Sequence, residues 1–448
     1  MKRKQASITS DSHFFVGDKI GAAQTSPPSH AVANSLQMFL CFGNWRGDDP
    51  LFCPPRLAMR LGKMENTMKR SAIVLAAAVL APATAFGAAL ERSNQSVSFM
   101  FHPGNHVETS IGVMSPQLKG KALNAVKAKS GQIAYDFDTG SVANSFGQAS
   151  AAVKYKFNDW LSLGVKYERP FGADVKYNDN DFGKGEVSPV GGMSAEAVAD
   201  NITALAKLNI TPNVSVFGGP AWQYQGSKVK VPFLGYVLDS PYTGAWGFVG
   251  GAGFEIPQYA MVGTVTYRSK TRYDHTVDET FTVGGKPVMK STNLVFDLPQ
   301  SVNVEFQTGV AKNTMVMAGA RWVDWTEFEL DPAFYHSATK NKLVSYADDE
   351  ILLSLGVGHR FNDKLSGLVS VSHDSGAGEH GSPLSPVGKG WGANIGASFT
   401  PSKNLSLSLG VGGKLFEDMD VYSAGKKVAE FNGDEWAWGM MGQLSYNW

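Results

Sequence analysis

From about residue 107 to the C-terminus, apolar side chains alternate with small or polar ones at a period of two residues. This period places successive side chains on opposite faces of a β-strand, whereas a helical face repeats about every 3.6 residues. One face of the last segment is apolar and mostly aromatic: Trp436, Trp438, Met440, Leu444, Tyr446 and Trp448. The other face is small or polar. We therefore expect an all-β fold.

The connections between these segments alternate between short and long. The short turns lie at Asn158-Asp159, Thr211-Pro212-Asn213, Pro257, Lys312-Asn313, Asn362-Asp363 and Pro401-Ser402-Lys403. The long connections lie at about 118–145, 174–196, 228–242, 274–292, 329–347, 375–388 and 420–434. A soluble sandwich also alternates along its strands, but short turns on one side and long loops on the other are typical of membrane barrels. The pattern predicts about fourteen strands.

The predicted strands must close on themselves if they lie in a membrane. Unpaired backbone groups in hydrocarbon cost several kcal/mol each, and a closed antiparallel barrel leaves none. An even strand number places both termini on the short-turn, periplasmic side, where the terminal Trp448 fits an aromatic girdle. The expected fold is a transmembrane antiparallel β-barrel in the outer membrane, with a short N-terminal plug.

The N-terminal part contains an export signal. Lys69 and Arg70 precede an apolar run of about ten residues and then small residues, as in a secretory signal peptide at 68–87. Signal peptides begin at the translation start, so we expect residues 1–67 to lie upstream of it. Both cysteines, Cys41 and Cys53, fall in this upstream part. We assign 88–106 to a short hatch and 107–448 to the barrel.

The charge balance and the short motifs argue against several classes of function. The 40 basic and 40 acidic residues balance, so no partnership with nucleic acid is expected. The triplet His373-Asp374-Ser375 is attributed to chance, because neighbouring strand residues point to opposite faces. His102 and His106 flank Pro103-Gly104, which breaks any helix that would align them as metal ligands. We expect no enzyme activity, no cofactor and no metal.

Several segments together resemble the FadL/TodX-type outer-membrane transporters of long-chain fatty acids and aromatic hydrocarbons. The resemblance covers nearly all of 107–448. It is carried by Trp246-Gly247-Phe248, Tyr267-Arg268-Ser269, Leu298-Pro299-Gln300, Trp322-Val323-Asp324-Trp325 and the closing strand from Trp436 to Trp448. The chain departs from the family in its short hatch, which lacks an Asn-Pro-Ala element.

The resemblance implies an inward kink in the third strand, through which a hydrophobic substrate leaves sideways into the membrane. The corresponding residues are Pro170, Phe171 and Gly172. Proline cannot donate to the strand ladder and glycine relaxes the backbone, so these residues are suited to interrupt pairing. Alternatively, they end the strand and begin a loop.

Five basic residues are candidates for holding a substrate carboxylate. Strand alternation predicts that Arg268, Lys270 and Arg272 point into the lumen together with Thr264 and Thr266. Lys228 and Lys230 approximate the region where the family places basic contacts. The competing interpretation is that all five are solvated charges of the lining or the loops.

The sequence thus predicts a passive outer-membrane channel for long-chain fatty acids or other hydrophobic compounds. The alternatives are a general diffusion porin and an outer-membrane lipid hydrolase. Expected partners are the hydrophobic ligand, outer-membrane lipid and the barrel assembly machinery, and the resemblance implies a monomer.

Overall fold

The computed structural model describes residues 90–127, 133–179, 186–378, 380–386, 388–423 and 425–448. The predicted upstream segment 1–67, the signal peptide 68–87 and the first two residues of the hatch lie outside the described residues. Among the described residues, no helix has the length and apolar character needed to cross a membrane.

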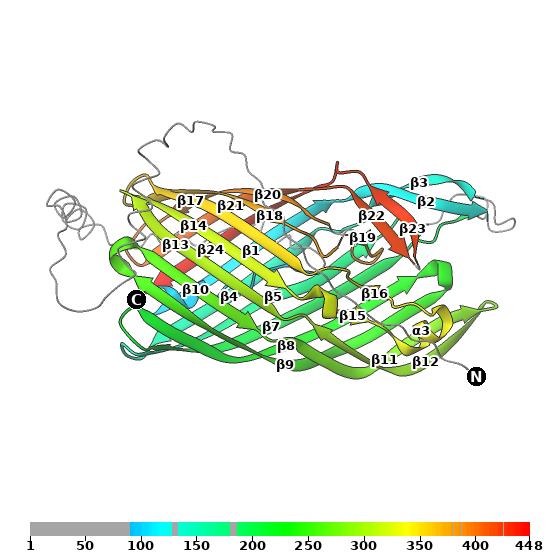
Figure 1. Ribbon diagram of the computed structural model, residues 1–448, viewed down its shortest axis with the longest axis horizontal. Helices are drawn as coiled ribbons and strands as arrows, with labels where there is room; N and C mark the ends of the chain where they lie inside the picture. The colour runs from blue at the N-terminus through cyan, green and yellow to red at the C-terminus, as the bar shows by residue number, and fades with distance from the viewer. Residues whose placement is uncertain (1–89, 128–132, 180–185, 379, 387, 424) are drawn as a thin grey trace, which may run out of the picture. The chain divides into compact units, whose positions relative to one another are not determined.

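Fourteen antiparallel strands form a closed barrel, as the sequence predicted (Figure 1). They are β1 (His106–Gln117), β4 (Phe146–Lys156), β5 (Leu161–Lys176), β7 (Ser194–Asn209), β8 (Val214–Val231), β9 (Tyr236–Ile256), β10 (Met261–Arg268), β13 (Ser301–Ala311), β14 (Thr314–Val323), β17 (Glu350–Arg360), β18 (Leu365–Asp374), β20 (Gly390–Phe399), β21 (Leu405–Phe416) and β24 (Trp436–Asn447). Each strand pairs with its neighbour along the chain, and β24 pairs with β1 to complete the ring.

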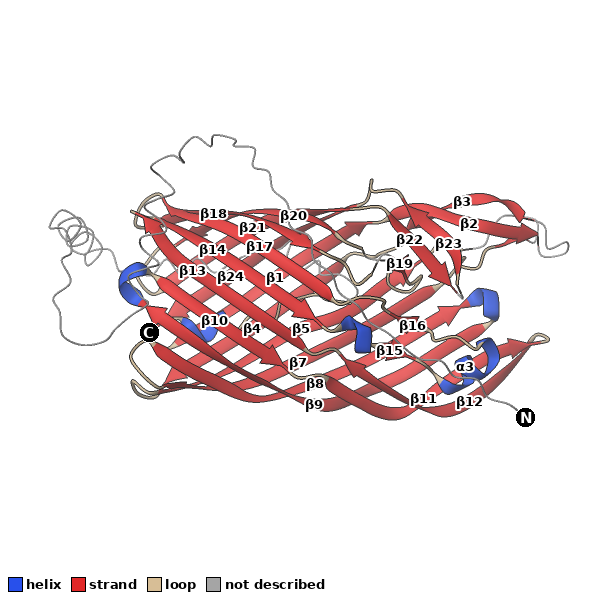
Figure 2. Ribbon diagram, viewed as in Figure 1, coloured by secondary structure: helices blue, strands red, loops and turns tan. Residues whose placement is uncertain are grey.

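A small sheet and a structured connection lie toward the end of the barrel opposite the C-terminus (Figures 1 and 2). One six-stranded sheet contains β2 (Lys119–Lys127), β3 (Ile133–Ser141), β6 (Glu186–Val187), β19 (His380–Gly381), β22 (Met419–Ser423) and β23 (Lys426–Phe431). The connection after β14 holds the two-stranded pair β15 (Glu329–Leu330) and β16 (Val344–Ser345) and helix α3 (Ala333–Thr339). The long connections therefore carry structure of their own.

Two predicted loops are instead strands. The connection expected at 228–242 shrinks to the short 3-10 turn η3 (Pro232–Leu234) with Gly235 between β8 and β9. The connection expected at 274–292 is the hairpin of β11 (Thr271–Val283) and β12 (Lys286–Leu298), which turns at Gly284 and Gly285 with positive φ. The sequence predicted a loop at 274–292 because β11 and β12 carry many charged and hydroxyl side chains.

The apolar face of each strand points out of the barrel. In β24, Trp436, Trp438 and Met440 are exposed, whereas Ala437 between them is buried. In β17, Leu353, Leu355 and Val357 are exposed in the same way. An exposed apolar surface of this extent requires an apolar surrounding, and buried polar side chains facing inward are typical of membrane barrels.

Candidate functional site

Strand β5, the third strand of the barrel, is interrupted near its middle. Its ladder with β4 stops at the pair Ser150 and Glu168. Its register with β7 shifts between Glu168 and Phe171, and pairing then continues to Lys176. The predicted interruption at Pro170, Phe171 and Gly172 therefore lies inside a continuous strand, and the alternative that the strand ends there is wrong.

Residues from the start of the described chain pair with the edge of β5 that is free at this interruption. The Arg92 amide donates to the Pro170 carbonyl at 2.8 Å, and the Gly172 amide donates to the Leu90 carbonyl at 2.9 Å. On the opposite side, the Gln148 amide group donates to the carbonyl oxygens of Arg92 and Arg169, at 2.5 and 3.2 Å. A short added strand thus occupies the gap between β4 and β5.

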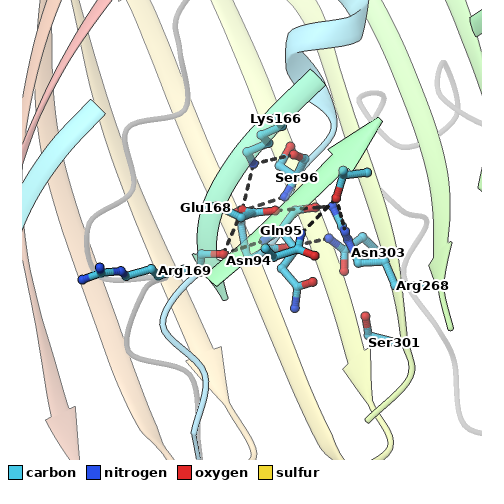
Figure 3. A network of polar contacts seen from close by, with 12 residues as sticks. Asn94, Gln95, Ser96, Lys166, Glu168, Arg169, Arg268, Ser301 and Asn303 are labelled. Atoms are coloured by element: carbon cyan, nitrogen blue, oxygen red, sulfur yellow. Dashed lines mark hydrogen bonds and ion pairs between the residues drawn. The ribbon is translucent and has the colours of Figure 1, made fainter. Parts of the chain in front are cut away.

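We call residues 90–105 the hatch, because side chains from several sides of the barrel wall hold them inside it (Figure 3). Lys166 of β5 donates to the Ser96 carbonyl at 2.8 Å, and Arg268 of β10 donates to the Gln95 carbonyl at 2.9 Å. Asn303 of β13 donates to the Asn94 carbonyl at 2.6 Å. The hatch therefore has its backbone oxygens satisfied by inward-pointing cations and amides.

Buried carboxylates balance these cations. Glu168 accepts from Ser93 at 3.0 Å and forms ion pairs with Lys166 at 3.0 Å and Arg268 at 3.5 Å. Glu91 of the hatch forms a second buried ion pair with Arg321 of β14. Breaking one partner of a buried pair costs about 3–5 kcal/mol, because the other charge stays buried without compensation.

Residues 97–101 of the hatch are mostly apolar. Val97, Phe99 and Met100 are fully buried against β4, β7, β8 and β9. Glycines in the wall make room for them: a side chain at Gly164 would collide with Met100 and Phe99, and one at Gly253 would collide with Phe101. This part therefore packs closely against one side of the inner wall.

A partly open apolar cavity lies next to the interrupted part of β5. Its walls come from the hatch, from β5, β7, β8 and β12, and from the long connections. The lining residues are Leu90, Phe171, Gly172, Ala173, Ala195, Glu196, Ala197, Val198, Ala199, Gln225, Ser227, Val229, Phe296, Leu298, Phe328, Leu330, Val344, Leu384 and Ser385. Glu196 is the single charged residue in this lining, which makes the cavity suited to an uncharged hydrophobic molecule.

The five predicted basic residues do not gather around this cavity. Arg268 points into the lumen, as do Thr264 and Thr266, but its guanidinium is engaged by Glu168 and the hatch. Lys270 and Arg272 are exposed and pair with Asp297, at 3.3 and 3.7 Å. The predicted inward direction is wrong for these two residues. Ser269 and Lys270 separate the inward-facing Arg268 and Thr271, so one extra residue reverses the alternation.

The other two basic residues also face outward. Lys228 and Lys230 are exposed, and Lys228 pairs with Asp239 at 3.1 Å. Val229 and Val231 take the inward positions instead, in the same alternation as Gln223 and Gln225 before them. A substrate contact by any of the five stays a prediction.

Sequence reasoning missed the residues that hold the hatch, namely Glu91, Glu168, Asn303 and Arg321. Part of the signal was present, because alternation places Lys166 and Glu168 on the polar face of their strand. Their partners lie far away in the sequence: Glu91 and Arg321 are 230 residues apart. Periodicity shows that a charge points inward, but it does not show which segment enters the lumen to meet it.

The triplet His373-Asp374-Ser375 does not form a catalytic arrangement. The His373 ring packs against Trp391 at a tilt of 60°, with 4.5 Å between the ring centres. Asp374 forms a buried ion pair with Lys414 at 2.6 Å, and the Ser375 hydroxyl accepts a hydrogen bond from the Ile351 amide. The three side chains serve separate contacts.

Comparison with known proteins places this fold. No protein-family model and no curated protein matches the sequence. A FadL homologue of Pseudomonas aeruginosa has a similar structure, with a TM-score of 0.63 and 13% identity over 78% of this chain and 92% of that one.

Two toluene transporters are also similar in structure. TodX of P. putida has a TM-score of 0.56 and 11% identity, over 78% of this chain and 92% of its own. TbuX of Ralstonia pickettii has a TM-score of 0.52 and 12% identity, over 81% of this chain and 95% of its own. The described barrel therefore has the fold of the FadL/TodX-type channels, as the resemblance in sequence predicted.

Proposed function

We propose that this protein is a passive channel through which small uncharged hydrophobic compounds cross the bacterial outer membrane. The observation that carries the proposal is the apolar cavity beside the interruption of β5. A ligand that enters the barrel from the end with the long connections reaches this cavity before it meets residues 97–101 of the hatch. Burial of apolar ligand surface contributes about 25 cal/mol per Å², which is sufficient to bind without any charged contact.

The exit that we propose is lateral, between β4 and β5. The hatch fills the barrel below the cavity, with Val97, Phe99 and Met100 buried against the wall. The ladder between β4 and β5 is missing beside the cavity, where residues 90–92 and the Gln148 side chain bridge the gap. Pairing with β5 resumes at residues 142–144, where the Asn144 amide donates to the Asp174 carbonyl at 2.9 Å. Local displacement of residues 90–92 opens this route without moving the rest of the hatch.

The chemistry of the cavity favours a neutral ligand over a fatty acid. A buried carboxylate needs a cation or several hydrogen-bond donors. The lining contains no lysine or arginine among the described residues, and its one charged group, Glu196, repels an anion. TodX and TbuX are toluene transporters, which agrees with this choice. Long-chain fatty acids remain the second candidate, because the fold is shared with a FadL homologue.

Uptake by liposomes containing the purified protein tests both ligand classes. We expect uptake of radiolabelled toluene to exceed that of a long-chain fatty acid. Phe171→Trp places a larger ring in the cavity and should reduce toluene uptake at least several-fold. Phe399→Trp, the same change on the outer surface, is the matched control and should leave uptake unchanged. If Phe171→Trp transports toluene at the rate of the native protein, the cavity is not on the route.

Fatty-acid uptake that is lost in Arg268→Gln and retained in Phe171→Trp would favour the second candidate instead. This outcome would assign ligand binding to the charged wall of the lumen.

A further inference from the structure

The turn between the hatch and β1 brings together three side chains of the kind that bind transition metals. Nitrogen or oxygen atoms of His102, His106 and Glu108 all lie within 4.8 Å of one another. The sequence argued against this arrangement, because Pro103 and Gly104 prevent a helix. Gly104 has a φ of +64° and instead allows a turn that stacks the two imidazole rings, with 4.0 Å between their centres.

One nitrogen atom of the His102 imidazole has no hydrogen-bond partner among the described residues. The Nδ1 atom of His102 is covered by the protein and makes no hydrogen bond to any described residue. A buried polar atom without a partner costs about 1–3 kcal/mol. A metal ion would supply the missing partner of this nitrogen. A neutral imidazole is the form that binds a metal.

The other two side chains are oriented by the last barrel strand. Asn447 accepts a hydrogen bond from Nδ1 of His106 at 2.8 Å, and Gln443 donates to Glu108 at 3.0 Å. Hydrogen bonds of this kind fix the orientation of metal-bound imidazoles and carboxylates. In the tautomer that donates Nδ1–H to the Asn447 side-chain oxygen, His106 directs the Nε2 lone pair toward the Glu108 carboxylate.

This contact calls for a cation. Nε2 of His106 lies 3.0 Å from Oε2 of Glu108, and a lone pair facing a carboxylate is repulsive unless a proton or a metal ion lies between them. Two donors bound side by side at about 2.1 Å from one ion are separated by about 3.0 Å at a right angle and about 3.4 Å at the tetrahedral angle. The observed distance therefore suits adjacent ligands of one ion.

We propose that His102, His106 and Glu108 bind one divalent transition-metal ion of the zinc class. The ring of His102 turns about its Cβ–Cγ bond to direct a nitrogen to the ion, and water completes the coordination. His102 belongs to the hatch, whereas His106 and Glu108 belong to β1 at its seam with β24. The ion therefore ties the hatch to the seam that closes the barrel.

Titration of the protein with Zn²⁺ tests this site. The protein is purified in detergent from the outer membrane of a Gram-negative host, with an affinity tag that contains no histidine. Calorimetry should show saturable binding of one ion, weakened about tenfold or more in His102→Ala and in Glu108→Gln. His359→Ala, which removes an exposed histidine at the end of β17, is the matched control and should bind as the native protein does.

A second measurement reports on the hatch. Val97 is buried, so a cysteine at this position, in a chain with Cys41 and Cys53 replaced by serine, reacts with a thiol reagent only when the hatch is displaced. Zn²⁺ should slow this reaction, and Glu108→Gln should abolish the effect. Absence of saturable binding, or equal affinity in the native protein and both ligand variants, would overturn the proposal.

Discussion

Glu91 and Arg321 show how much the lumen depends on single residues. They form a buried ion pair between the hatch and β14, and Arg321 also donates to Ser301 and Asn303 at 3.1 and 2.5 Å. Both side chains are less than one-tenth exposed. The pair is therefore a strong constraint on the position of the hatch, because neither charge reaches water while the other is in place.

Glu91→Gln should release the hatch. Loss of the carboxylate leaves Arg321 buried without its partner, at a cost of about 3–5 kcal/mol, which favours displacement on the order of a hundredfold or more. The measurement is the thiol reaction rate of a cysteine at position 97. Glu417→Gln, in an exposed ion pair with Lys389, is the control and should not change the rate.

The double variant Glu91→Gln with Arg321→Met distinguishes charge from packing. Removing both charges should restore slow reaction, because no uncompensated charge remains in the lumen. A double variant that reacts as fast as Glu91→Gln would mean that the ion pair does not set the position of the hatch.

At the scale of elements, the strands of the barrel could be predicted from the sequence. The direction in which their side chains point could not be predicted in every strand. Alternation identified β17, β21 and β24 because each keeps one face apolar along its whole length. The interruption between β10 and β11 reversed the alternation at Lys270, whereas β8 kept its phase, with Gln225 and Val229 both inward and Lys228 outward. A local backbone irregularity of one residue leaves no trace in composition but reverses every side chain after it.

The interruption of β5 was visible in the sequence because its cause is local. Pro170 has no amide proton to donate, and a side chain at Gly172 would lie 2.7 Å from Arg92 of the hatch. The cavity was not visible, because residues of β5, β8 and β12 and of the long connections meet there only in the closed barrel.

Repairing the interruption tests lateral exit. Pro170→Val with Gly172→Val supplies the missing amide donor and two β-branched residues, so β5 should pair with β4 along more of its length. Toluene uptake should fall at least tenfold while the folded barrel is retained, as judged by its gel mobility before and after heating. The control is Leu163→Val, an outward-facing position on the same strand that does not line the cavity. Unchanged uptake in the double variant would contradict a lateral route.

At the scale of the whole molecule, apolar side chains face outward and polar side chains face inward, which is the reverse of a soluble protein. The outward faces present Ile111, Leu355, Ile395 and Leu409, each more than half exposed. The lumen instead buries charged and hydroxyl groups, among them Glu168, Arg268 and Thr203. Aromatic residues mark the short-turn end: Tyr155, Phe157, Trp160, Phe254, Tyr259, Phe361, Phe399, Tyr446 and Trp448. This distribution fits a barrel in a lipid bilayer.

The central claim is that hydrophobic compounds cross this barrel while its lumen stays closed to water and ions. The most direct test measures toluene uptake and chloride conductance on the same preparation of protein-containing liposomes. Our account predicts saturable toluene uptake with conductance close to that of empty liposomes, because the hatch fills the barrel between β4 and β9. A high, steady conductance without toluene uptake would contradict the account and identify a general diffusion porin.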